Sequence, residues 1–256
     1  MKGDAHKTLA KVVTFLASVS GRNRIARFLQ YFSKWLQTVF KFYSLRLGGH
    51  PGLEFYAEKA SKLASSMSNT RKVLRWGNVT KMVHLCLQMI DEYNSPRTPE
   101  DRYKASKNPY IHYLRLASNI CNAGYYTCDH VTYLYGLTWI RNEKLNDKAG
   151  YSGSVFWFIN ILCMIAADIQ EIILLNEFIA NEKMSQGNGA KAEDSAKIEK
   201  AKKRIWDCKY EIIQCLIDTP CALHYVSSYK WFSPGLVYFL SSVTSVMQAY
   251  TAWPKK

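Results

Sequence analysis

The feature that most limits the fold of this chain is helical periodicity. Apolar residues recur every three or four positions over long stretches that hold few Gly or Pro residues. The apolar–polar alternation that is typical of half-buried strands is rare. Arg22–Leu47 and Leu53–Arg75 show the helical spacing clearly, and the turn-forming run Gly48–Gly52 separates them. The sequence therefore predicts an all-α protein.

The last apolar segment, Gly235–Trp253, runs for nineteen residues without a charged side chain. As a helix it would be about 28 Å long, close to the roughly 30 Å hydrocarbon core of a bilayer. Aromatic residues stand at both of its ends, as at membrane interfaces (Tyr229, Trp231, Tyr250, Trp253). Its small and hydroxyl side chains suit close helix contacts in lipid: Gly235, Ser241, Ser242, Thr244, Ser245 and Ala249. The segment predicts a transmembrane helix, with a buried helix of a soluble protein as the alternative.

A second apolar segment, Val155–Leu175, is also long enough to cross a bilayer. It contains Asp168 and Glu171, and carboxylates at that depth need partners. Arg115 and Arg141 are the candidate partners. The sequence leaves open whether this segment spans.

The positive charge is concentrated in the N-terminal third. Residues 1–90 hold 15 Lys and Arg against 3 Asp and Glu, in a chain whose formal net charge is +14. A basic region beside apolar segments favours an anionic partner, either phospholipid headgroups or nucleic-acid phosphate. Charge alone does not choose between the two.

These patterns divide the chain into five consecutive regions. They are a basic amphipathic helical region (1–93), a loop (94–109), an apolar helical region with a candidate span (110–180), a linker with a charged amphipathic helix (181–230) and a C-terminal transmembrane helix (231–256). The expected fold is an all-α, membrane-associated helical bundle with amphipathic N-terminal helices and one or two C-terminal transmembrane helices.

The sequence carries none of the short motifs of common enzyme chemistry. The seven Cys form no Cys-x-x-Cys pair and no zinc spacing with the six His. There is no phosphate loop, Gly-rich nucleotide fingerprint or nucleophile elbow. Cys128 and His130 are two positions apart, so on a helix they face different ways. We expect no catalytic residue, no metal and no cofactor, and hence no enzyme.

Several segments, in order, resemble the peroxin-eleven family of peroxisomal membrane proteins. They are Gly21–Arg24 with Arg27–Tyr31, Ser68–Gly77, Tyr126–His130, Trp157 with Asp168, and Ser233–Pro254. No single match is specific to this family, but the order of all the matches over residues 4–256 is specific to it. Asn23 stands where that family usually has an acidic residue, and Met184–Ser195 is of uncertain equivalence. The subtype therefore stays open, including the glycosomal relatives.

The resemblance implies a protein of the peroxisomal membrane, or the glycosomal membrane if the source organism has glycosomes. It implies a role in organelle elongation and division through self-association and the fission machinery, with an anionic phospholipid membrane and no nucleic acid as partner. In that family an amphipathic helix inserts into one leaflet, and its counterpart here is Leu53–Arg75. The expected lipid contacts are apolar and basic residues of this helix: Leu53, Lys59, Lys62, Leu63, Met67, Arg71, Lys72, Leu74 and Arg75.

The residues alone leave three alternatives. The apolar stripe of Leu53–Arg75 could pack inside a helical bundle while its basic flank is solvated. Asp129, Asp168 and Glu171 could line a pore for small metabolites. Basic residues among Phe28, Tyr31 and Trp35 could bind nucleic acid, although no motif supports this.

Overall fold

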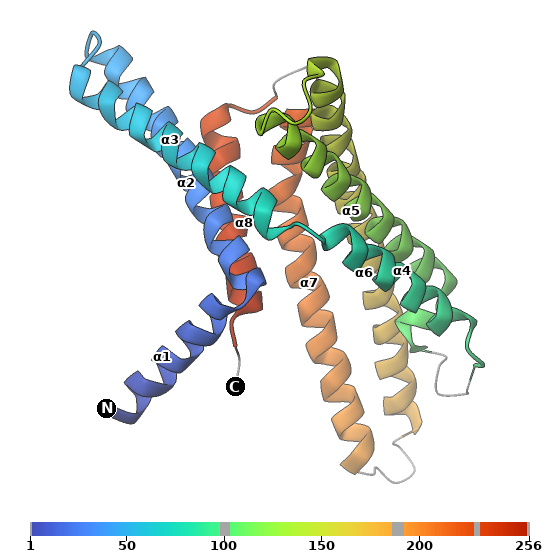
Figure 1. Cartoon of the computed structure of the whole chain (residues 1–256). Helices are drawn as coiled ribbons and strands as arrows, with labels where there is room; N and C mark the ends of the chain where they lie inside the picture. The colour runs from blue at the N-terminus through green and yellow to red at the C-terminus, as the bar shows by residue number, and fades with distance from the viewer. Residues whose placement is uncertain (1, 98–102, 186–191, 228–230, 255–256) are drawn as a thin grey trace. The chain divides into compact units, whose positions relative to one another are not determined.

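The computed structural model describes residues 2–97, 103–185, 192–227 and 231–254. Within these ranges the chain forms eight α-helices, one short 3-10 helix and no strand (Figure 1). The elements are α1 (Lys2–Ala17), α2 (Val19–Arg46), α3 (Pro51–Leu74), α4 (Asn78–Asn94), η2 (Ala105–Lys107), α5 (Pro109–Gly136), α6 (Glu143–Ser185), α7 (Ala192–Val226) and α8 (Pro234–Ala252). The predicted all-α fold is confirmed.

The chain groups into two compact units, each made of segments that are distant in sequence. Unit 1 comprises Met1–Trp76, Asp129–Tyr151 and Pro220–Lys256, and unit 2 comprises Gly77–Cys128 and Ser152–Thr219. One limit falls at Pro220 inside α7, where a residue without a backbone N–H interrupts the helical hydrogen bonds. The five regions predicted above follow the chain in sequence, so this spatial grouping does not test them.

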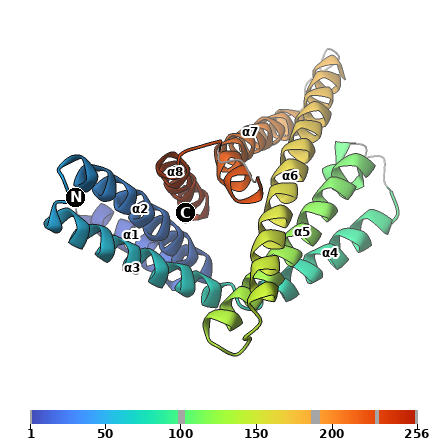
Figure 2. The ribbon, with the colours of Figure 1, turned by 90° about the horizontal axis from the view of Figure 1, so that it is seen from above.

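Unit 1 is organised around α2, which packs against α3 and α8. The chain reverses between α2 and α3 at Gly48 and Gly49, whose φ values of 70° and 89° suit glycine. Pro51 then opens α3, where a missing N–H costs nothing. As a result α2 and α3 lie side by side over their length, as both views show (Figure 2).

The break between α1 and α2 falls at Ser18. The Gly21 N–H donates a hydrogen bond of 2.9 Å to the Ser18 hydroxyl, which caps α2. A Cβ at position 21 would lie 2.0 Å from the carbonyl oxygen of Phe15. Only glycine therefore permits this close turn.

Unit 2 contains α4, η2 and the larger parts of α5, α6 and α7. The Ser118 hydroxyl of α5 donates to Asn160 of α6 over 2.6 Å. Within the loop predicted at 94–109, the Lys107 ammonium donates to the carbonyl oxygens of Ser95 (2.7 Å) and Tyr93 (3.4 Å). A lysine on the last carbonyls of a helix caps its C-terminus. The described part of this loop is thus fixed to the end of α4.

Of the described residues, one helix is long and apolar enough to cross a membrane, Glu143–Met184 in α6. Only 28% of its apolar window is buried, whereas the core helix of a soluble protein would be mostly buried. α8 does not meet the same criterion, because its Ser, Thr and Gln side chains lower its mean hydropathy. α6 therefore replaces Gly235–Trp253 as the strongest candidate span. Residues 186–191 of the predicted linker Met184–Ser195, and the flanking Tyr229, lie outside the described residues.

Candidate membrane-contact surface

One side of α3 packs against α2 through small side chains. Ala57, Ala60 and Ala64 follow helical spacing and are only 3%, 7% and 3% exposed. Small side chains let two helix backbones approach closely. This part of the apolar stripe packs within the protein, as the bundle alternative anticipated.

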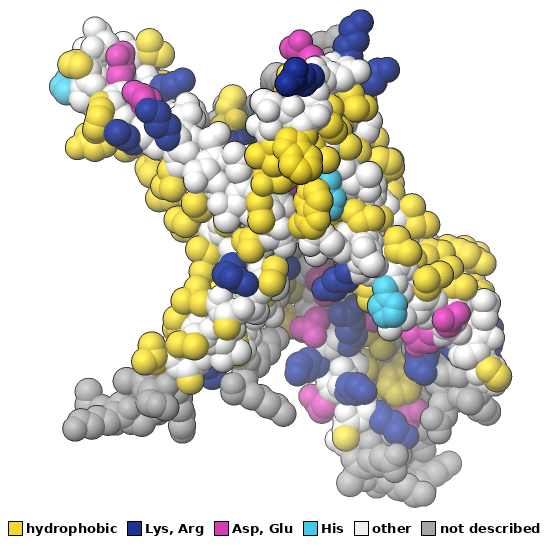
Figure 3. All heavy atoms as spheres, in the orientation of Figure 1, with side chains coloured by type: hydrophobic (Ala, Val, Ile, Leu, Met, Phe, Trp, Pro, Cys, Tyr) yellow, Lys and Arg dark blue, Asp and Glu magenta, His cyan; other side chains and the backbone are white. Residues whose placement is uncertain are grey.

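The exposed side of α3 mixes aromatic, aliphatic, basic and acidic side chains. Glu58 pairs with Lys62 there, and the ring of Tyr56 also contacts that of Phe40 on α2. Phe55, Tyr56 and Leu63 are 54%, 58% and 44% exposed, and Lys59 and Lys62 are exposed beside them. The Lys59 ammonium lies 5.0 Å from the centre of the Phe55 ring. Hydrophobic and basic side chains are visible together on the outer surface of the α2–α3 pair (Figure 3). Aromatic rings with adjacent cations are typical of a membrane–water interface. We call this set the outer face of α3.

Two of the predicted phosphate contacts turn inward instead. Arg71 donates to the side-chain oxygen of Gln30 on α2 over 2.5 Å, and Arg75 pairs with Asp129 of α5 at 2.9 Å. The side chains of Arg75 and Asp129 are only 7% and 10% exposed. In this structure both arginines hold α3 to its neighbours.

The remaining predicted lipid-contact residues lie between these two sides of α3. Leu53, Met67, Lys72 and Leu74 are partly buried. Burial lowers the pKa of Lys72, and the nearby carboxylate of Asp129 partly offsets this shift. The structure thus brings Lys59, Lys62 and Leu63 together on the exposed side and separates them from the arginines. The locations of these side chains do not show whether they contact lipid, so lipid contact stays a prediction.

Sequence reasoning missed Phe55 and Tyr56, because it followed the stripe that contains the alanines. Both sides of α3 carry apolar residues at helical spacing, so periodicity does not distinguish them. The available signal was residue size, since small residues favour helix–helix contact and aromatic residues favour interfaces.

Apart from Val237, the buried side chains of α8 are polar, and its exposed side chains are mostly apolar. Ser241, Thr244 and Ser245 have no exposed surface, whereas Phe239 and Val246 are 46% and 54% exposed. The prediction that the small and hydroxyl side chains of this helix make close contacts is confirmed for these three residues. On α2 the buried Arg27 faces this side and donates to the Thr244 hydroxyl over 3.3 Å. A polar interior under an apolar exterior is the arrangement of helices that meet lipid rather than water.

Unit 2 contains a group of charged side chains on α5, α6 and α7, in which the two carboxylates of α6 are buried and the other members are partly exposed. Arg115 pairs with Asp168 at 3.1 Å and also with Glu171. Arg204 pairs with Glu171 at 2.7 Å and with Glu211 at 3.4 Å. The predicted pairing of Asp168 and Glu171 with Arg115 is confirmed, and Arg204 is a further partner that the sequence did not indicate. We call these five residues the charged cluster.

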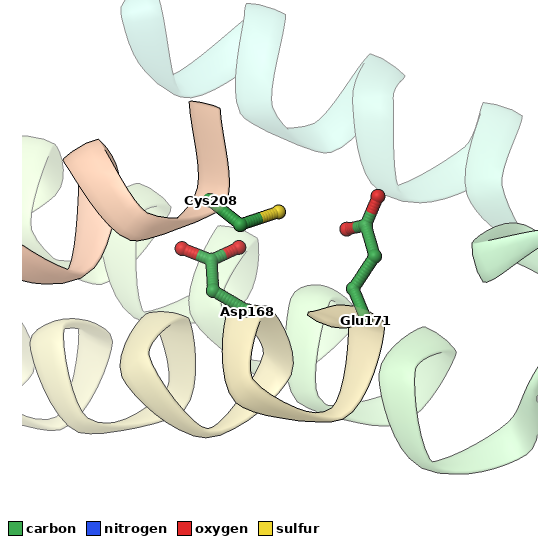
Figure 4. Close-up of side chains that lie close together, drawn as sticks. All are labelled: Asp168, Glu171 and Cys208. Carbon is green, nitrogen blue, oxygen red and sulfur yellow. The ribbon is translucent and has the colours of Figure 1, made fainter. Parts of the chain in front are cut away.

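Two of these carboxylates and a thiol lie close enough together to resemble a metal site. Ligand atoms of Asp168, Glu171 and Cys208 all lie within 4.8 Å of one another (Figure 4). Burial, and then the charge of Glu171, raises the pKa of the Cys208 thiol, whereas a metal ligand must be the thiolate. Arg115 and Arg204 already balance the carboxylates. The group fits an ion-paired helix contact better than a metal centre.

The same geometry bears on the pore alternative. Asp168 has no exposed surface and Glu171 is 5% exposed, and arginines pair with both. Side chains that line a water-filled path would be accessible to it. The pore stays a prediction that no observed feature favours.

Comparison with known proteins gives one consistent result. The family model described as "Peroxisomal biogenesis factor 11 (PEX11)" matches residues 9–253. The chain is 24% identical over 275 residues to "Peroxisomal membrane protein 11 homolog" of Dictyostelium discoideum. The alignment covers 99% of this chain and 98% of the relative. No solved structure matches this chain.

The match extends over nearly all of α1 to α8 and includes both the outer face of α3 and the charged cluster. It is to a family of membrane proteins of organelle biogenesis rather than to a family of enzymes. The chain therefore belongs to the peroxisomal biogenesis factor 11 (PEX11) family and is a protein of the peroxisomal membrane with a role in peroxisome biogenesis.

Proposed function

We propose that this protein elongates and remodels the peroxisomal membrane before organelle division, with the outer face of α3 as its lipid-contact surface. The observation that carries the proposal is the exposure of Phe55, Tyr56 and Leu63 beside Lys59 and Lys62 on one helix. A helix that lies in the headgroup plane spreads one leaflet and favours curvature. Each lysine near an anionic surface adds roughly 1 kcal/mol of attraction.

The packing of α3 against α2 limits how this helix can insert. Its alanine side is covered, so only the outer face is available, and its insertion would be shallow. Shallow insertion by one copy bends a membrane weakly, and many copies acting together are needed. We therefore include self-association in the proposal, with delivery of the elongated membrane to the fission machinery as its outcome.

The test is tubulation of anionic vesicles by the full chain. Phe55→Ser with Tyr56→Ser removes the exposed rings, and Lys59→Gln with Lys62→Gln removes the cations. Each pair is expected to reduce tubule formation at least severalfold, because apolar burial and charge act together. Lys144→Gln with Lys148→Gln is the matched control, since both lysines are exposed and the charge change is the same.

Reduction of vesicle binding by high salt in the wild type, but less in the Lys59 and Lys62 variant, would add support. Equal tubulation by the wild type and both outer-face variants would refute the proposal. So would an equal loss of activity in the control.

A further inference from the structure

Unit 2 contains a cavity of about 350 Å³ that is separate from the outer face of α3. Four of its lining side chains are cationic, Lys104, Lys197, Lys200 and Arg204, and none of the lining residues that the structure describes is acidic. Apolar side chains of α6, Leu175 and Phe178, form another part of the lining. A cavity of this size is within the range of pockets that hold small ligands.

The cations of α7 converge because of their spacing. Lys197, Lys200 and Arg204 are three and four positions apart, which places them on one side of the helix. Dark-blue side chains gather over this part of α7 in the space-filling view (Figure 3). Glu199 of α7 does not line the cavity and pairs with Lys202 at 2.6 Å. Glu171 and Glu211 pair with Arg204, so they orient its guanidinium without lining the cavity.

The apolar part of the cavity lining comes from the C-terminal end of the candidate span in α6. Leu175 ends the apolar segment Val155–Leu175, and Phe178 follows within one helical turn. The Phe178 ring also contacts Tyr103, with ring centres 5.4 Å apart. Cations and apolar side chains therefore meet where α6 changes from apolar to polar. Basic pockets between helices at a bilayer surface are suited to anionic lipid headgroups.

We propose that this cavity binds one anionic glycerophospholipid. Its phosphate would contact Lys197 and Lys200, and the start of an acyl chain would contact Leu175 and Phe178. The cation set selects for phosphate, and the apolar lining selects for a phosphate that carries a chain. The proposal does not rest on membrane contact by α3, which belongs to the other unit.

The test is calorimetric titration of the full chain in nonionic detergent with dioctanoyl phosphatidic acid. Saturable binding at about one lipid per chain is expected, with much weaker binding of dioctanoyl phosphatidylcholine. Lys197→Gln with Lys200→Gln should weaken binding about tenfold or more, from the loss of two phosphate contacts. Ala201→Leu should also weaken it, because Ala201 lines the cavity and the larger side chain occupies its volume.

Lys203→Gln with Lys209→Gln is the matched control, since both lysines are exposed on the same helix and neither lines the cavity. Equal weakening in this control, or no saturable binding by the wild type, would overturn the proposal. Equal competition by inorganic phosphate would show a site for free phosphate and would overturn the lipid assignment. Vesicle tubulation by the same variants reports on α3, so failure here and failure of the remodelling function are distinguishable.

Discussion

Helix α8 of unit 1 and the charged cluster of unit 2 bury polar groups by different means. In unit 1, the buried hydroxyls of Ser242 and Ser245 on α8 donate to carbonyl oxygens of their own helix, over 2.8 and 2.6 Å. In unit 2, the buried carboxylates of Asp168 and Glu171 depend on arginines from other helices. A hydroxyl bonded within its helix needs no particular neighbour, whereas a buried carboxylate does. The α8 packing should therefore tolerate changes to such hydroxyls, and the charged cluster should not tolerate changes to its charges.

The largest effect is expected from removing one charge of the cluster. Glu171→Gln removes a buried carboxylate that pairs with two partly exposed arginines, Arg115 and Arg204, which should cost about 3 kcal/mol of stability. The measurement is the midpoint of thermal unfolding in detergent, followed by circular dichroism. Glu177→Gln is the control, because Glu177 is exposed on the same helix. If both variants unfold at the same temperature, the cluster does not stabilise unit 2.

A smaller effect is expected from enlarging a side chain at the α2–α3 contact. Ala60→Leu places a bulky group where Ala60 is 7% exposed, and overpacking of this kind costs about 2 kcal/mol. Ser65→Leu adds a similar side chain at an exposed position of α3 and should change stability little. The same unfolding measurement applies. Tolerance of Ala60→Leu would show that α3 is not held closely against α2.

The smallest effects compare two hydroxyls of α8. Ser245→Ala removes a bond within the helix and should change stability by about 0.5 kcal/mol or less. Ser241→Ala removes a bond of 3.0 Å to the Cys221 sulfur on α7 and should cost about 1 kcal/mol. Denaturant titration of both variants would measure this difference. The reverse order would contradict the distinction between bonds within and between helices.

Much of the fold could be predicted from local sequence. The turn at Gly48 and Gly49, the break near Ser18 and the helical character of every main segment depend on residues close together in the chain. The hydroxyl side of α8 was also predictable, because its small residues recur at helical spacing. Such features are local, and one sequence is sufficient to find them.

The features that were missed depend on contacts between distant segments. α6 continues through Asp168 and Glu171 because Arg115 and Arg204 balance their charges, and one sequence gives no indication that Arg204 lies nearby. The inward position of Arg75 likewise depends on Asp129, which lies on α5. A charged side chain that the sequence alone would place in solvent can thus be buried in an ion pair between helices. The nine predicted lipid contacts were separated for this reason.

The length of α6 has a consequence for how it can sit in a bilayer. Its 43 residues span about 64 Å at roughly 1.5 Å per residue. A hydrocarbon layer of about 30 Å holds roughly 26 residues even at a steep tilt of about 40°. If α6 spans a bilayer, a third or more of the helix must project into the headgroups or the aqueous phase. A helical stalk of several turns is thus continuous with the immersed part and can relay a force between water and lipid without a flexible joint.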